Sequence, residues 1–211
     1  MNTLSETSMA RPMKVSLWLF NPFHIVAGLP ALTIGLLLLV ASGFLASLSN
    51  SHFDGVLDFH TGAVRPVWFP VVECLINWVV MSVLLLVSGM LVSKSHIRPV
   101  DVFGTQALAR APSLVTACAA LLPGFQEGCQ FLLLKTTGQV PPEISASDWA
   151  VFSFVTVTAV LMVVWMVFLM YRGFTVACNV WMGKAIAVFI PALIVGEVVS
   201  KVLILMLIAM S

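Results

Sequence analysis

The sequence predicts an all-α fold, a polytopic bundle of five transmembrane helices with its N-terminus in the cytoplasm and its C-terminus outside. Three observations predict this class. Hydrophobic residues fill 60% of the 211 positions and charged residues only 9%, and the mean hydropathy is +1.07. Soluble domains are typically about 45–50% apolar and about 25% charged. The apolar residues also form runs long enough to cross a bilayer, which takes about 20 helical residues.

The same composition excludes other classes. A soluble chain of this size cannot bury so much apolar surface, and disordered chains and nucleic-acid binders carry far more charge. The formal net charge of +1 gives no general attraction for an anionic partner. Cysteines without C-x-x-C spacing favour packing roles over disulfides or a metal centre. These cysteines are Cys74, Cys118, Cys129 and Cys178.

Five apolar runs are the expected spans. No Lys, Arg, Asp or Glu occurs between Lys14 and Asp54, and none occurs between Asp148 and Arg172. The third and fifth runs are less pure, because prolines and polar residues interrupt them. The expected spans are residues 25–48, 69–92, 112–134, 149–171 and 185–210.

The chain before the first span is expected to be a cytoplasmic tail, residues 1–24. Residues 13–23 are typical of an interfacial segment that ends at Asn21-Pro22. A cleaved signal peptide fits less well, because the apolar run is too long for its hydrophobic region. Residues 25–211 then form one five-helix membrane domain, with a further short helix at the cytoplasmic surface between Arg98 and Pro112.

Orientation follows from the excess of basic residues in cytoplasmic loops. The tail, the second loop and the fourth loop hold seven basic residues, and the opposite side holds two. This asymmetry predicts a cytoplasmic N-terminus and an outward C-terminus. The seven are Arg11, Lys14, Lys94, Arg98, Arg110, Arg172 and Lys184, and the two are Arg65 and Lys135.

Helix association in lipid relies on close packing through small residues. Three expected spans carry small residues four positions apart, which predicts that the first, third and fifth helices form the centre of the bundle. The fourth helix, richer in bulky side chains, is expected to face lipid. The packing residues are Ala27, Ala31 and Gly35; Ala120, Gly124 and Gly128; and Ala192, Gly196 and Ser200.

Ionisable residues inside spans are costly and need a partner or a wet cavity. Glu197 and Lys201 are four residues apart, the favourable order for an ion pair within a helix. We expect one outward-facing polar cluster, comprising Glu73, Asn77, Glu127, Gln130, Glu197 and Lys201. It is either a hydrogen-bonded network that fixes helix register or a proton or cation site with Glu197 as charge carrier.

The first outer loop contains two imidazoles and two carboxylates, His52, Asp54, Asp58 and His60. Such a set can surround Zn²⁺ or a similar ion. Its spacing matches no common metal motif, and Asp54-Gly55 is typical of a turn. A turn with solvated charges is therefore favoured, and neither a metal nor a cofactor is expected.

Three segments resemble the Yip-domain (Ypt-interacting-protein type) family of five-span membrane proteins, especially its short bacterial members. They are Asn21-Pro22-Phe23, the stretch from Phe103 to Pro112, and the stretch from Arg172 to Ile186. The resemblance implies a cytoplasmic N-terminus and no catalytic residues. Eukaryotic members engage Rab-type GTPases and shape membranes, and whether such binding applies to this chain stays open.

Two functions follow as hypotheses. The first is a non-enzymatic Yip-like organiser that binds the bilayer and another membrane protein or a cytoplasmic protein, in a bacterial cytoplasmic membrane. The second is a small transporter or ion-conducting protein that uses the intramembrane charges. No phosphate loop, nucleophile elbow or H-E-x-x-H motif supports an enzyme.

Overall fold

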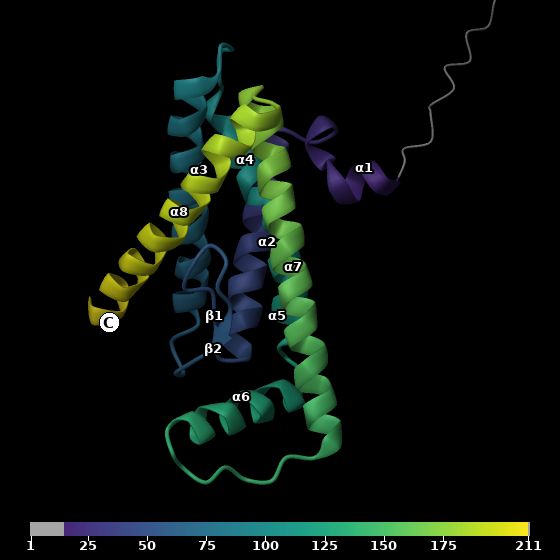
Figure 1. The fold of residues 1–211 in the computed structure, drawn as a ribbon, viewed down its shortest axis with the longest axis vertical. Coiled ribbons are helices and arrows are strands. Elements are labelled where there is room, and N and C mark those ends of the chain that lie inside the picture. The colour runs from purple at the N-terminus through teal and green to yellow at the C-terminus, as the bar shows by residue number, and fades with distance from the viewer. Residues whose placement is uncertain (1–14, 211) are drawn as a thin grey trace, which may run out of the picture.

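The computed structural model describes residues 15–210, and within them the fold is helical apart from one two-stranded hairpin (Figure 1). The basic residues Arg11 and Lys14 of the orientation count lie outside the described residues. The elements are α1 Val15–Phe20, η1 Pro22–His24, α2 Gly28–Leu48, β1 Ser51–His52, β2 His60–Thr61, α3 Trp68–Val92, α4 Pro99–Ala109, α5 Pro112–Ala119, α6 Pro123–Thr136, α7 Ala146–Cys178 and α8 Met182–Met210.

Four helices, α2, α3, α7 and α8, are long and apolar enough to cross a membrane. They agree with the expected first, second, fourth and fifth spans, and α7 is longer than expected at 33 residues. In the described part of the expected interfacial segment, the chain forms the two short helices α1 and η1. There the indole nitrogen of Trp165 on α7 donates to the Leu19 carbonyl at 2.9 Å.

The expected third span, residues 112–134, is wrong as a single helix. α4 and α5 together run over Pro99–Ala119, and α6 then turns away by 85°. The break falls at Leu122, whose backbone is extended (φ −68°, ψ 124°) because the next residue is Pro123. Figure 1 shows α6 lying across the end of the bundle while α4 and α5 run along it. Counting the bent pair as one span gives five.

α4 lies inside the bundle, which corrects the expected surface helix between Arg98 and Pro112. Six of its residues are buried, among them Gly104, Gln106 and Ala107. α4 packs against α2 and α7, and the Gln106 amide nitrogen donates to the Met170 carbonyl of α7 at 3.0 Å. A small-residue helix fills this position because larger side chains would hold its neighbours apart.

The backbones of α2 and α4 approach each other closely. A Cβ on Gly35 would collide with the backbone of Ala107 and Leu108, and a Cβ on Gly104 would collide with the carbonyl of Gly28. Ala31 is fully buried in the same contact. Of the three packing residues predicted on α2, Ala31 and Gly35 therefore lie in the contact with α4, whereas Ala27 is exposed.

The other two sets of predicted packing residues contact different neighbours. Ala192, Gly196 and Ser200 are buried, but α8 packs mainly against α3, so the fifth helix is not part of the centre. Gly124 and Gly128 hold α6 against the first turns of α7, where a Cβ on Gly128 would collide with Phe152. Ala120 is fully buried just before the break.

α7 is the least enclosed of the four long helices, because only 11% of its most apolar stretch is buried. This agrees with the expectation that the fourth helix faces lipid. Its inner face still contributes Met166, Met170 and Phe174 to the largest apolar core, together with Met81 and Leu85 from α3.

The α2–α4 crossing gives a first prediction. Gly35→Ala should lower the unfolding free energy by about 1–3 kcal/mol, because the added methyl group must push two backbones apart. Thermal unfolding in detergent measures this change. Gly183→Ala is the control, since a Cβ there meets nothing within 4 Å; equal melting temperatures for the two variants would contradict this packing.

Candidate functional site

Residues 49–67 connect α2 to α3 and form a hairpin that is inserted into the bundle (Figure 1). β1 and β2 pair antiparallel, with Ser51 opposite Thr61 and His52 opposite His60. The start and tip of the hairpin are enclosed: Ser51 is fully buried and Val56 is 2% exposed. Val56 packs in the main apolar core with Met81 and Leu85. A polar backbone among apolar helices must find hydrogen-bond partners there.

α3 supplies the first set of partners. The Glu73 side chain is 1% exposed, and its Oε2 accepts from the Phe53 amide nitrogen at 3.1 Å. One turn further, the Asn77 amide nitrogen donates to the Phe53 carbonyl at 2.6 Å. Both backbone groups of Phe53 are therefore satisfied by side chains of one helix, as they would be by a neighbouring strand.

His52 completes this first anchor. Its Nδ1 lies 3.1 Å from Glu73 Oε1, and its Nε2 lies 3.0 Å from the Ala63 carbonyl oxygen. Both ring nitrogens face acceptors, and only the protonated imidazole donates from both. Burial lowers the pKa of His52, but the hydrogen bond and charge of Glu73, with the Ala63 carbonyl, outweigh burial and raise the pKa.

α8 supplies the second set of partners. Glu197 Oε2 accepts from the Leu57 amide nitrogen at 2.9 Å, and Glu197 Oε1 lies 3.3 Å from Lys201 Nζ. Lys201 Nζ in turn donates to Asp58 Oδ2 at 2.7 Å. A Cβ on Gly55 would collide with the Glu197 carboxylate, so a larger residue at the hairpin tip would have to displace that carboxylate.

Arg110 is one ionisable residue that the sequence interpretation placed wrongly. It lies at the α4–α5 junction and is 5% exposed, so it belongs to the interior and not to a cytoplasmic loop. Its Nη2 donates to the Asn77 carbonyl at 3.0 Å, while its Nε has no hydrogen-bond partner among the described residues. The signal that could have found it is the run of small residues on either side, which is typical of a packed helix.

A narrow pocket lies beside Arg110 and the hairpin tip, with room for about one water molecule. Its polar lining includes Asp58, Ser113 and Thr116, and its apolar lining includes Phe59 and Met166. The pocket therefore lies between the hairpin tip and the inner face of α7.

The structure brings together four of the six residues expected in one polar cluster, but as two anchors. Glu73 and Asn77 bind one arm of the hairpin, and Glu197 and Lys201 bind its tip. Glu127 and Gln130 lie exposed on α6, beyond the break at Leu122. The sequence interpretation missed the hairpin itself as the common partner of these charges.

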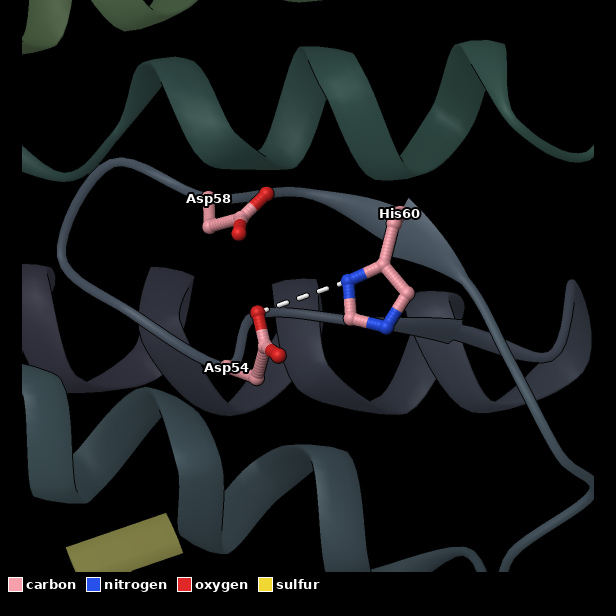
Figure 2. A group of neighbouring side chains, drawn as sticks. All are labelled: Asp54, Asp58 and His60. Carbon is pink, nitrogen blue, oxygen red and sulfur yellow. Dashed lines mark ion pairs between the residues drawn. The ribbon is translucent and has the colours of Figure 1, made fainter. Parts of the chain in front are cut away.

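Three of the four His and Asp residues of the loop converge. Ligand atoms of Asp54, Asp58 and His60 all lie within 4.8 Å of one another. Figure 2 shows the two carboxylates and the imidazole facing one space between the arms of the hairpin, with His60 Nδ1 3.4 Å from Asp54 Oδ1. His52 is engaged with Glu73 instead.

Comparisons of the chain with protein-family models, with curated proteins and with solved structures found no match. The class that fold and site define is an all-helical protein with four to five helices long and apolar enough to span a membrane, and with a polar hairpin held inside it.

The first anchor gives a second prediction. Glu73→Gln should destabilise the protein by about 2–4 kcal/mol, because it leaves a buried imidazolium without its counter-charge. Thermal unfolding in detergent measures this loss. Glu127→Gln makes the same chemical change at an exposed position of α6 and should leave stability unchanged; similar melting temperatures for both variants would contradict the role given to Glu73.

Proposed function

We propose that the chain is an integral membrane protein with five spans, with a cytoplasmic N-terminus and an outward C-terminus, in a bacterial cytoplasmic membrane. The bent helix pair serves as the third span. Removing Arg110, and Arg172 which lies inside α7, from the loop count leaves five basic residues on the proposed cytoplasmic side against two on the other. The excess of basic residues that supports this orientation therefore remains after the correction.

Cysteine labelling tests the orientation. Val140, in the α6–α7 loop and 95% exposed, should become reactive toward a membrane-impermeant maleimide in intact cells when changed to cysteine. His96→Cys, in the α3–α4 loop, should react only after permeabilisation. The variants are made in a chain whose four native cysteines are replaced by serine or alanine. The reverse pattern would overturn the orientation.

We propose further that the protein is non-enzymatic and acts, as Yip-like proteins do, as a membrane organiser or partner-binding component. One observation carries this proposal. The carboxylates within the long helices, Glu73 and Glu197, each accept from a backbone amide of the hairpin and each pair with a cation, His52 of the hairpin or Lys201 of α8. Groups held in this way hold a structure together and are poorly placed to exchange a transported ion.

The surface proposed to bind the partner is formed by residues 93–98 and 179–184, at the end of the bundle opposite α6. The two loops are joined by a hydrogen bond from the Asn179 amide to Ser95 Oγ at 2.9 Å. Trp181 is 48% exposed and donates to Asn179 Oδ1. Lys94, Arg98 and Lys184 add positive charge, which suits an acidic segment of another membrane or cytoplasmic protein.

Charge reversal on this surface tests the partner. Affinity purification from native membranes in mild detergent should recover a stoichiometric protein with the parent chain. Lys94→Glu together with Lys184→Glu should reduce that recovery by more than about tenfold. Lys135→Glu, on α6 at the other end, should not. Equal recovery with both variants would contradict this surface, and recovery of the chain alone would contradict the proposal.

Transport is the second candidate, and the pocket beside Arg110 and Asp58 favours it. Proton and cation flux into liposomes separates the two functions. The organiser proposal expects the same background flux for the parent chain and for Glu197→Gln. A flux in the parent chain that Glu197→Gln abolishes would replace the organiser with a transporter.

A further inference from the structure

We propose that Asp54, Asp58 and His60 form a binding site for a divalent transition-metal ion of the zinc class. Their three ligand atoms lie within 4.8 Å of one another. The bond lengths of Zn²⁺ to nitrogen and oxygen, about 2.0–2.2 Å, place neighbouring tetrahedral ligand atoms about 3.4 Å apart. The His60 Nδ1 to Asp54 Oδ1 distance already has this value, 3.4 Å (Figure 2).

A buried oxygen supports the site independently of this spacing. Asp54 Oδ1 is shielded from solvent and has no hydrogen-bond partner among the described residues. A carboxylate oxygen without water or a donor is costly unless a cation compensates it. The oxygen is the atom nearest the His60 nitrogen, so an ion placed between them would satisfy both groups at once.

The third ligand is held in place by the second anchor. Asp58 Oδ2 accepts from Lys201 Nζ at 2.7 Å, and the adjacent Leu57 amide is fixed by Glu197. Hydrogen bonds of this kind orient metal-binding carboxylates in known sites. The ligand atom of Asp58 lies within 4.8 Å of those of Asp54 and His60, and rotation of its side chain can bring it to coordination distance.

Two carboxylates, Asp54 and Asp58, face the space of the site, and Lys201 pairs with Asp58. A cation placed between two carboxylates relieves their mutual repulsion.

The ligand set selects the class of ion. One imidazole nitrogen with two carboxylate oxygens is typical of Zn²⁺ and its neighbours in the first transition series, whereas Ca²⁺ and Mg²⁺ prefer all-oxygen sites. The His60 and Asp54 side chains are 46% and 31% exposed, so an ion can reach them from solvent. A water molecule would complete the coordination.

Metal titration of the full-length protein in detergent tests the site. After chelator treatment and dialysis, the chain should bind one equivalent of Zn²⁺ by competition with a chromogenic chelator, and Zn²⁺ should raise its melting temperature. Co²⁺ should give the visible absorption of a low-symmetry nitrogen–oxygen site. Asp54→Asn and His60→Gln should each weaken binding by more than about tenfold.

Two controls keep the result decisive. His96→Gln, in the exposed α3–α4 loop, should bind Zn²⁺ as the parent chain does. Size-exclusion profiles and circular dichroism of the metal-free variants show whether Asp54→Asn and His60→Gln remain folded. Folded variants that bind Zn²⁺ with parental affinity overturn the site, as does a parent chain that binds none, and binding of Ca²⁺ or Mg²⁺ but not Zn²⁺ overturns the ion class.

Discussion

The structure depends on a polar hairpin that enters an apolar bundle. Backbone amides and carbonyls are costly away from water unless they are hydrogen-bonded. Here Glu73 and Asn77 pair with both backbone groups of Phe53, and Glu197 pairs with the Leu57 amide. Cations balance the two carboxylates, His52 at one and Lys201 at the other. Each charge therefore has a partner that compensates its burial.

The helix arrangement leaves room for this hairpin. α2 and α4 pack closely against each other at Gly35 and Gly104. α8 is left to pack on α3, and the hairpin tip contacts it through Glu197 and Gly55. Val56 then joins the core between α3 and α7. The hairpin thus adds a link from the packed pair of α3 and α8 to α7, which has few direct contacts with either of them.

The four long apolar helices could be predicted from the sequence, because bilayer thickness and charge-free runs define spans directly. The ion pair of Glu197 and Lys201 also follows from helical spacing alone, and the structure confirms it at 3.3 Å. The bend within residues 112–134 could not be predicted, because apolar stretches lie on both sides of Pro123 and only the backbone at Leu122 shows that they are separate helices. The expectation of one helix there made Arg110 a loop residue and brought Glu127 into the bundle.

The hairpin could not be predicted for a different reason. A loop with several charges is typical of a solvated turn, and no local pattern indicates that distant helices supply its partners. Leu57 and Glu197 are 140 positions apart in the chain. The convergence of Asp54, Asp58 and His60 could not be predicted either, because these residues meet only when the two arms of the hairpin pair. Spacing in the sequence identifies candidate residues, and the three-dimensional fold determines which of them lie close together.

Backbone hydrogen exchange at Phe53 and Leu57 tests most directly whether the intramembrane carboxylates hold the hairpin. Both amides should be protected in the parent chain, unlike the amide of Val140 in the exposed α6–α7 loop. Glu197→Gln should accelerate exchange at Leu57 more than at Phe53, and Glu73→Gln should do the opposite. Exchange at both amides as fast as in the exposed loop, or unchanged by either substitution, would contradict this account.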